Sequence, residues 1–351
     1  MNIKTLKAKL LEQTPEKVLS KNDFLSSGST LLNLACSGRI DGCYAKGIYH
    51  SLTGDSDTGK SVLAITALAE ASISSNFKNY QLIYYNAERA NLLSLDYFPS
   101  ALRKRIEILF PSTLEEFYYD IDDRMKKGSI VSVLDSMDSL STEADEKTFQ
   151  KGKAAFKKGK EGPGSYGTKA KVNAGKLNRT CGQVRDTNSI LLVISQTRDN
   201  FNASMFGPKK TRSGGHALKF YNRFEVWFSV REHLKQSYKG NQIQIGTKAK
   251  CSVKKNHLSG KKRDVEICIY NDHGLDDTGD CINYLLFWKH WKGSENSFKA
   301  PEFLFSGGKE ELVKKIRAKK ETRLPRLKKI VAQVWDEVES AVKLDRSPNY
   351  E

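Results

Sequence analysis

The sequence has no long apolar run. No stretch of about 20 consecutive apolar residues occurs, which is the length that a membrane-spanning helix needs, so we expect no transmembrane span and no membrane partner. The opening residues, Met1-Asn2-Ile3-Lys4, lack the apolar segment of a secretion signal. Cysteine is sparse too, and the six that occur are scattered without C-x-x-C spacing. Neither a zinc site nor a disulfide framework is indicated, and we expect reduced core thiols in an intracellular protein.

Acidic residues are too few to balance the basic ones. Lysine and arginine number 58 against 41 aspartates and glutamates, which gives a net charge of +17. A charge of this size points to a polyanionic partner, with nucleic acid ahead of a membrane surface. A soluble protein with a merely basic surface would show the same total. The position of the charges along the sequence therefore has to decide between these two interpretations. The chain has 351 residues, which is long enough for two or three domains.

Residues 53–61, TGDSDTGKS, match the phosphate-binding pattern G-x-x-x-x-G-K-[ST] at every required position. A strand-like run precedes them and a helical run follows, which is the context that the pattern requires. The glycines would let backbone N–H groups face the phosphates at a helix N-terminus. Lys60 would reach the β- and γ-phosphates, and the Ser61 hydroxyl would bind Mg²⁺. The residues predicted to hold the nucleotide are Gly54, Asp55, Ser56, Asp57, Thr58, Gly59, Lys60 and Ser61.

Two further strands are predicted to lead to carboxylates. Residues 81–86 (QLIYYN) end shortly before Glu88. A carboxylate at the end of a strand next to the phosphate-binding strand could polarise an attacking water, whereas an exposed loop glutamate would leave the same trace in the sequence. Residues 129–135 (SIVSVLD) end in Asp135, which we assign to the Mg²⁺ side of the site, with Asp138 as the second candidate.

A third buried strand is predicted at residues 189–195 (SILLVIS), and Gln196 follows it at once. A neutral amide at the end of a strand beside the γ-phosphate could sense whether that phosphate is present. We therefore include Gln196 among the candidate catalytic residues.

Two basic segments leave the ends of these strands. Residues 141–188 interleave lysines with glycines and hold few apolar residues, which predicts a mobile cationic loop flanked by helical pieces. Residues 197–215 combine cations with Phe206 and close on a glycine pair. Because the two strands are expected to be adjacent, the pair of segments favours a nucleic-acid surface over a solvated linker. The candidate contacts are Lys157, Lys158, Lys160, Arg198, Phe206, Lys209, Lys210, Arg212, Gly214 and Gly215.

The rest of the chain completes an α/β fold. Further elements are predicted as a strand at 105–110, a helix at 114–126, and antiparallel strands at 223–231, 242–253 and 265–269 that extend the sheet. Composition changes near residue 293, after which lysine-rich helices are expected. The chain is therefore divided into an N-terminal helical or oligomerisation segment at 1–24, a core at 25–292 and a C-terminal region at 293–351.

Three stretches carry a resemblance to a known family. They are LSSGSTLLNLACSGRIDGCYAKGIYHSLTGDSDTGKS at 25–61, NAERA at 86–90 and MFGPKKTRSGGHALKFYNRFEVWF at 205–228. The chain resembles the RecA-type strand-exchange recombinases, in a phage-borne UvsX-like or RecA-like version, over residues 24–290. The resemblance implies a P-loop ATPase core whose central, mostly parallel twisted sheet is extended by antiparallel strands. A small N-terminal helical segment and a helical C-terminal region would flank this core.

The resemblance assigns roles to residues of this sequence. ATP would be the nucleotide, Glu88 would activate water beside Lys60, and Asp135 would lie on the Mg²⁺ side. Gln196 would relay the state of the γ-phosphate to DNA. A first DNA loop is expected at 156–168. The residues that fall on the family's second DNA loop are Arg198, Met205, Phe206, Gly214 and Gly215.

The resemblance also places ATP between neighbouring protomers. Lys219 and Phe220 correspond to a helix at the subunit interface, and Lys255 would reach the neighbour's phosphates in trans. His257 stands where a second lysine is expected, unless the register shifts to Lys254. The residues nearest to the position of the family's adenine-stacking tyrosine are Leu95 and Tyr97.

The implied activity is that of an ATP-dependent recombinase. The chain would polymerise as a helical filament on single-stranded DNA and pair it with double-stranded DNA. A single-strand binding protein and a loader would be further partners, in the cytoplasm of a bacterium or, for a phage protein, of its host.

Two other functions stay open. A hexameric RecA-fold helicase would share the phosphate-binding loop and Asp135 but not the stretch at 205–228. A non-catalytic recombination mediator would keep ATP as a structural ligand. The presence of Lys60, Ser61, Glu88 and Asp135 together argues against the mediator.

Overall fold

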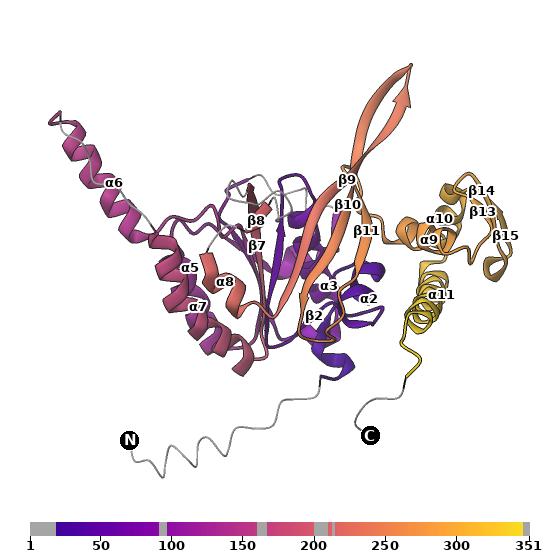
Figure 1. Cartoon of the computed structure of the whole chain (residues 1–351), viewed down its shortest axis with the longest axis horizontal. Coiled ribbons are helices and arrows are strands. Elements are labelled where there is room, and N and C mark those ends of the chain that lie inside the picture. The colour runs from indigo at the N-terminus through magenta and orange to yellow at the C-terminus, as the bar shows by residue number, and fades with distance from the viewer. Residues whose placement is uncertain (1–18, 91–96, 160–166, 200–209, 213–214, 347–351) are drawn as a thin grey trace, which may run out of the picture.

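The computed structural model describes residues 19–90, 97–159, 167–199, 210–212 and 215–346 (Figure 1). One large sheet runs through the molecule. From edge to edge its strands are β12 (Gly274–Leu275), β11 (Asp264–Tyr270), β10 (Asn241–Asn256), β9 (Phe224–Tyr238), β3 (Ile48–Gly54), β7 (Ile190–Asp199), β6 (Ile130–Asp135), β4 (Gln81–Asn86) and β5 (Ile106–Leu109). Strand β8 (Lys210–Arg212) lies off this path and pairs with the end of β7.

The strand directions confirm the predicted sheet. From β9 to β5 neighbouring strands are parallel, and β10, β11 and β12 continue from β9 as antiparallel strands. The parallel part is apolar on both faces, and β6 is buried at every residue. Successive residues of β4 divide between two hydrophobic clusters, with Leu82 and Tyr84 in one and Ile83 and Tyr85 in the other. The phosphate-binding strand β3 therefore lies in the middle of a sheet that is covered on both faces.

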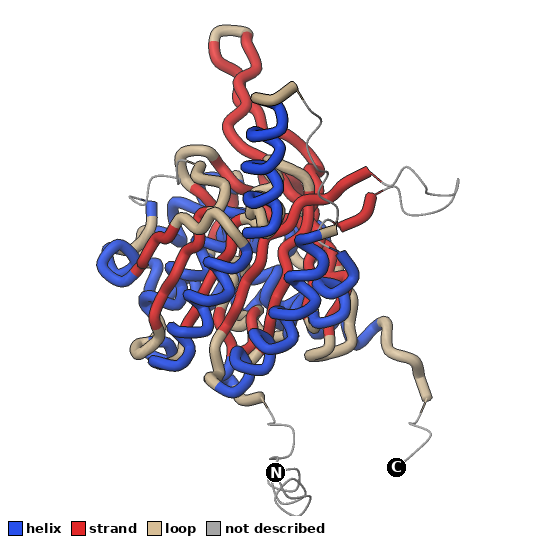
Figure 2. Tube along the Cα trace, turned by 90° about the vertical axis from the view of Figure 1, so that its left-hand side faces the viewer, coloured by secondary structure: helices blue, strands red, loops and turns tan. Residues whose placement is uncertain are grey.

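Helices cover both faces of this sheet (Figures 1 and 2). One cluster is formed with α2 (Thr30–Ser37), α3 (Lys60–Ile73), α4 (Ser100–Arg105) and α9 (Asp277–Phe287), and the other with α5 (Leu114–Lys127), α7 (Thr168–Asp186) and α8 (Gly215–Tyr221). In α5 the predicted face of Phe117, Ile121 and Met125 is buried, and Thr113 with Glu116 closes a capping box at its start. The short elements are η1 (Lys21–Asp23), β1 (Phe24–Leu25), β2 (Tyr44–Ala45) and η2 (Ser75–Phe77).

Two elements project from the body of the molecule (Figure 1). The β9–β10 hairpin continues beyond the sheet, and the outer halves of both strands are exposed. Helix α6 (Glu143–Phe156) has no buried residue, and Phe149 and Phe156 point an apolar surface at solvent. The outer half of the hairpin and helix α6 are therefore not held in place by core packing.

Residues 141–188 differ from the predicted loop. The helical pieces expected around the loop take up most of the segment, as α6 and α7, and the described residues between them, 157–159 and 167, are turn or bend residues. Several lysines that were predicted to be mobile, such as Lys171 and Lys176, lie on α7. The reason is a buried stripe of Asn173, Leu177, Thr180 and Val184 at helical spacing, which is half polar and so gives a weak apolar signal.

The C-terminal region contains a small sheet that was not predicted. Strands β13 (Gly293–Ser294), β14 (Ser297–Ala300) and β15 (Phe305–Gly307) pair with each other, with η4 (Pro301–Phe303) between the last two. The expected helices follow as α10 (Lys309–Arg317) and α11 (Lys320–Ala341). Within the described ranges, no helix is long and apolar enough to cross a membrane. All six cysteines are free thiols, and all but the half-buried Cys181 are buried.

Helix α11 is joined to the core by a shared carboxylate. Glu339 accepts from Arg263 Nε at 2.5 Å, from Arg263 Nη2 at 2.9 Å and from Lys261 Nζ at 2.7 Å. The Arg263 guanidinium, against the effect of burial and with help from Lys261, lowers the pKa of Glu339 to about 2. The pKa of Glu339 in the folded protein lies below its ordinary value of 4.5. The ionised Glu339 therefore stabilises the fold fully above pH 4.5, and this contribution is lost as the pH falls through about 2.

We expect Glu339→Gln to lower the free energy of unfolding by about 1–2 kcal/mol at neutral pH, because two partly exposed cations lose their partner. The difference from the wild type should shrink as the pH falls from about 5 to about 2. Urea denaturation followed by circular dichroism across this range measures it. Glu337→Gln, on the exposed side of the same helix, is the control, and an equal loss in both variants would contradict the ion-pair origin.

Candidate functional site

The phosphate-binding loop connects the end of β3 at Gly54 with the start of α3 at Lys60. A Cβ atom at Gly54 would collide with the carbonyl oxygen of Phe228 on β9. Gly59 has a φ of 82°, and a Cβ there would meet the side chain of Ile269. The close approach of β9 therefore requires glycine at position 54, and the left-handed backbone favours it at position 59. The loop leaves the N-terminus of α3 facing the site, where backbone N–H groups attract anions.

The side chain of Lys60, the first residue of α3, turns back toward the phosphate-binding loop. Its ammonium donates to the Thr58 hydroxyl at 3.2 Å and to the main-chain carbonyl of Asp55. The side chain is buried, and burial lowers the pKa of the ammonium, while the carboxylates of Asp135 and Glu88 raise it in part. A cation that is held among carboxylates in this way is ready to exchange its neutral partners for phosphate oxygens.

Asp135 ends β6 and lies close to the loop. Its Oδ2 accepts from the Tyr84 hydroxyl at 2.5 Å. Burial raises the pKa of the Asp135 carboxyl, and hydrogen bonds from Ser61 and Tyr84 oppose that rise. A carboxylate and a hydroxyl within hydrogen-bond reach are hard oxygen donors of the kind that Mg²⁺ prefers. The residues present therefore fit Mg²⁺, which Ser61 and Asp135 would hold and which would offset phosphate charge when bound.

Glu88 and Gln196 meet at the mouth of the site. Gln196 Nε2 donates to Glu88 Oε1 at 3.2 Å, and the Ser136 hydroxyl donates to the same oxygen at 2.8 Å. The expectation that the strand of Glu88 adjoins the phosphate-binding strand was wrong, because β7 and β6 lie between β4 and β3. Glu88 nevertheless reaches the site from the turn after β4, where its N–H donates to the Asp135 carbonyl at 3.2 Å.

Gln196 was expected just after the end of its strand, but β7 continues to Asp199. The continuation exists because Thr197, Arg198 and Asp199 pair with β8, which begins 11 residues after Asp199. Gln196 is therefore an internal strand residue, and its neighbour across the sheet is Gly54 at the start of the phosphate-binding loop. This places its amide between the nucleotide loop and the β7–β8 pair.

Asp138, the second candidate for Mg²⁺, has a different contact. Its Oδ2 accepts from the main-chain N–H of Gln196 at 2.7 Å. Asp138 and Tyr84 are residues with clear roles in the geometry that sequence reasoning did not assign. The only signal for Tyr84 was its place in the predicted strand at 81–86, and Asp138 gave none beyond its position after Asp135.

The residues predicted to contact DNA are described only in part. Lys157 and Lys158 are exposed in the turn after α6, and Arg198 is exposed on β7. Lys210 on β8 forms an ion pair with Asp55 of the phosphate-binding loop. Arg212 pairs with Thr197 through the strand backbone, and Gly215 begins α8. The predicted contacts that lie outside the described residues are Lys160, Met205, Phe206, Lys209 and Gly214.

Comparison with known proteins decides the family. The model of the RecA N-terminal domain matches residues 7–276. The chain belongs to the RecA family. It is 29% identical over 277 residues to Protein RecA of Helicobacter pylori strain P12, a match that covers 77% of this chain and 72% of that protein. It is also 29% identical over 262 residues to the plasmid Protein RecA of Lactococcus lactis subsp. lactis, with coverage of 74% and 69%.

As a RecA family member, the chain is an ATP-dependent DNA recombinase and a DNA-dependent ATPase that uses ATP with Mg²⁺. It binds DNA and forms filaments. The family match favours this activity over the hexameric helicase that the phosphate-binding loop alone left open.

The residues predicted for the subunit interface, Lys219, Phe220 and Lys255, lie on α8 and at the end of β10, which contact each other. Lys219 and Phe220 are exposed on α8, and 77% of Phe220 is accessible. Lys254 and Lys255 were expected in a turn but belong to the last residues of β10, and His257 begins the turn. Lys255 Nζ donates to the Lys219 carbonyl at 3.1 Å, so this lysine is directed to α8 and not to its own phosphate-binding loop.

Of the two candidates for adenine stacking, only Tyr97 belongs to the described residues. Tyr97 is half exposed, and Leu95 lies outside the described residues.

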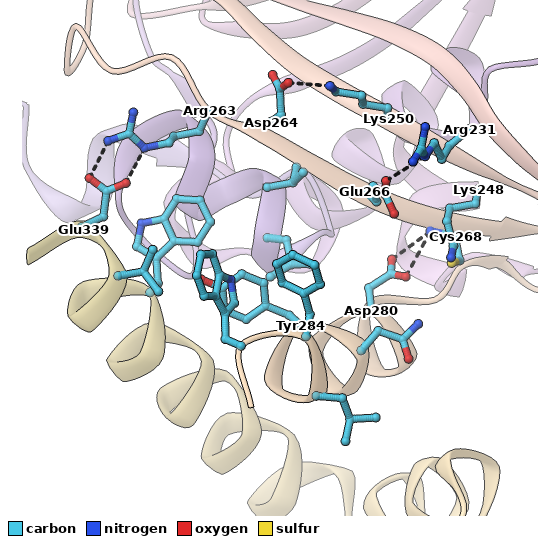
Figure 3. A pocket seen from close by; sticks show the side chains of 18 of the residues that line it. Arg231, Lys248, Lys250, Arg263, Asp264, Glu266, Cys268, Asp280, Tyr284 and Glu339 are labelled. Atoms are coloured by element: carbon cyan, nitrogen blue, oxygen red, sulfur yellow. Dashed lines mark hydrogen bonds and ion pairs between the residues drawn. The ribbon is translucent and has the colours of Figure 1, made fainter. Parts of the chain in front are cut away.

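A separate groove of about 1010 Å³ lies between β10, β11, α9 and α11 (Figure 3). Tyr284, Phe287, Trp288 and Trp335 form its apolar lining. Its charged rim is internally paired, as Figure 3 shows for Arg263 with Glu339 and for Lys250 with Asp264. None of the residues predicted for the nucleotide or DNA lines it.

We expect Asp138→Ala to reduce DNA-stimulated ATP hydrolysis about tenfold, because a main-chain N–H loses its acceptor and Gln196 loses its position. The change in KM for ATP should be smaller, and Asp138→Asn, which keeps an acceptor oxygen, should recover most of the rate. Steady-state hydrolysis with and without single-stranded DNA measures both, with Asp123→Ala on the surface of α5 as the control. A loss that excess Mg²⁺ restores would instead identify Asp138 as a metal ligand.

Proposed function

We propose that the chain polymerises as a helical filament on single-stranded DNA and pairs that strand with homologous double-stranded DNA, exchanging strands with it. The observation that carries this proposal is the contact between Gln196 and Glu88, beside the phosphate-binding loop. It connects the group suited to activate water with the strand that leads into the second basic segment. One hydrogen-bonded unit therefore adjoins both the nucleotide and the DNA surface.

The nucleotide residues take the following roles in this proposal. Lys60 and the N–H groups of Gly54 to Ser61 bind the β- and γ-phosphates, and Ser61 with Asp135 holds Mg²⁺. Glu88 accepts a hydrogen bond from the attacking water and orients it toward the γ-phosphate. Ser136 fixes the carboxylate of Glu88 through its hydroxyl. The chain contributes positioning and charge, which supply most of catalysis in phosphoryl transfer.

The DNA residues respond to the nucleotide through Gln196. Its side chain bonds to Glu88, its N–H to Asp138, and its strand continues directly into Arg198. A shift of the amide toward a γ-phosphate would therefore move the start of the second DNA loop. Phosphate contacts would come from Arg198 and from the cations of the first loop, Lys157, Lys158 and Lys160. The remaining contacts of the second loop would be Met205, Phe206, Lys209, Lys210, Arg212, Gly214 and Gly215.

Assembly would bury the surface around α8. Phe220 is a large apolar side chain that α8 leaves exposed, so it is available for contact with a second protomer. We assign Lys219 and Phe220 to the interface between protomers, with Lys255 reaching the neighbour's ATP. The segment at 1–24 would serve oligomerisation beside a core at 25–292 and a C-terminal region at 293–351. A single-strand binding protein and a loader would assist, in the cytoplasm of a bacterium or of a phage host.

Hydrolysis assays and imaging test the proposal together. ATP turnover is measured with and without single-stranded DNA, and the same samples are imaged by negative-stain electron microscopy. Stimulation by DNA with extended filaments supports the recombinase. Closed rings of fixed subunit number that unwind a forked substrate would show a helicase, and ATP binding without stimulated turnover would show a mediator.

We expect Lys60→Ala to lower ATP hydrolysis at least about a hundredfold, because the cation that faces the β- and γ-phosphates is lost. Circular dichroism well below the unfolding temperature should show the wild-type secondary structure, since both hydrogen bonds of the Lys60 ammonium are to residues of its own loop. Lys78→Ala, at an exposed position after α3, is the matched control. Retention of more than a tenth of the rate would contradict the assignment of the phosphate site.

We expect Phe206→Ala to weaken binding of single-stranded DNA about tenfold, because loss of one stacked base contact costs about 1–3 kcal/mol. Fluorescence anisotropy at moderate salt in the presence of a slowly hydrolysed ATP analogue measures the affinity. Phe110→Ala, an exposed phenylalanine after β5, is the control. If Phe206→Ala leaves the affinity at the wild-type value, the second DNA loop has been placed wrongly.

A further inference from the structure

Both the main-chain carbonyl and the side-chain carboxylate of Asp55 accept hydrogen bonds. Its main-chain carbonyl accepts from the Lys60 ammonium. Its carboxylate accepts from the Thr197 hydroxyl through one oxygen and from the Lys210 ammonium through the other. A single residue of the phosphate-binding loop is therefore bonded to the catalytic lysine and to two strands outside the loop.

The strand register explains why these groups meet. β3 ends at Gly54, which lies opposite Gln196 on β7. β7 continues past this point, and β8 pairs with the continuation, with Lys210 opposite Asp199. Asp55 thus leaves β3 beside Thr197 and faces the two-stranded stem of β7 and β8. This stem, defined here as residues 197–199 with 210–212, borders the segment that we assign to the second DNA loop.

The ion pair between Asp55 and Lys210 is better suited to link the movements of these two residues than to stabilise the fold. The side chains of Lys210 and Asp55 are 47% and 41% exposed, and pairs with that exposure add little to stability. Although burial acts to raise the pKa of Asp55, its hydrogen bonds from Lys210 and Thr197 bring that pKa below the usual value. The carboxylate is therefore ionised at neutral pH and holds both donors at once.

We propose that Asp55 is a positioning residue that joins the phosphate-binding loop to the stem of the second DNA loop, with Lys210 as its partner. When phosphate oxygens take the Lys60 ammonium, the Asp55 carbonyl loses its donor and the residue can shift. Its carboxylate then carries the shift to Lys210 and Thr197. This route runs beside the one through Gln196, and it gives Lys210 a role other than the phosphate contact predicted from the sequence.

The inference rests on the proposed function, because it takes residues 200–209 to be a DNA loop. By linkage, a contact that lets nucleotide alter DNA affinity also lets DNA alter nucleotide affinity to the same extent. The measurable quantity is the coupling ratio, defined as the affinity for single-stranded DNA with ATPγS divided by that with ADP. Each nucleotide is used at a saturating concentration, so that a change in nucleotide affinity does not enter the ratio.

The test measures the coupling ratio for a labelled oligothymidine by fluorescence anisotropy. We expect Asp55→Asn and Lys210→Gln each to lower the ratio about three- to tenfold, and the double variant to lower it no further than the stronger single variant. Lys210→Arg, which keeps the cation, should retain the wild-type ratio. Lys126→Gln, which breaks a comparable exposed pair with Asp122 on α5, is the control and should change nothing.

Other outcomes would overturn the inference. If Lys210 only contacts DNA phosphates, Lys210→Gln weakens binding equally with both nucleotides and Asp55→Asn leaves both affinities unchanged. If Asp55 only shapes the phosphate-binding loop, Asp55→Asn changes the nucleotide affinity and leaves the ratio at the wild-type value. A wild-type ratio of one would show instead that the proposed coupling of DNA binding to ATP is absent altogether.

Discussion

The nucleotide site depends on keeping opposite charges close together at the buried edge of a parallel sheet. Lys60 and Asp135 are only 6% and 5% exposed, and each would be costly to bury alone in its charged form. They lie close because parallel strands end at the same edge and the helix after β3 begins there. The hydroxyls of Thr58 and Tyr84 complete their hydrogen bonding. The carboxylates of Glu88 and Asp55 also act on Lys60, so a nucleotide with Mg²⁺ would enter a site that is rich in carboxylates.

Strand β7 is the element through which this site communicates with the rest of the molecule. In three consecutive residues it presents Gln196 to Glu88, Thr197 to Asp55 and Arg198 to solvent. It also lies directly between the phosphate-binding strand and the strand of Asp135. β7 pairs with β3 as far as Gln196 and with β8 from Thr197 onward, so one continuous strand adjoins both the phosphate-binding loop and the β8 stem.

The sequence predicted what is encoded locally. The phosphate-binding loop, the apolar strands at 81–86 and 129–135 and the amphipathic helix α5 all follow from short patterns of residue type. Contacts between distant residues could not be predicted in this way. Asp138 meets Gln196 across 58 residues, and Asp55 meets Lys210 across 155. The extension of β7 and the ion pair of Lys210 both arise from pairing with β8, for which a run of three polar residues gives no strand signal.

Helix α6 shows how an ordered element can be independent of the core. It spans 14 residues, which corresponds to about 21 Å, and it buries none of them, so its unfolding exposes no core surface. An isolated helix of this length is marginally stable in water and exchanges with coil in about a microsecond. Local opening of α6 is thus much cheaper than global unfolding. Opening of α6 would let the lysines at its far end move while the geometry around Lys60 stays fixed. Insertions within α6 would likewise leave the geometry around Lys60 unchanged.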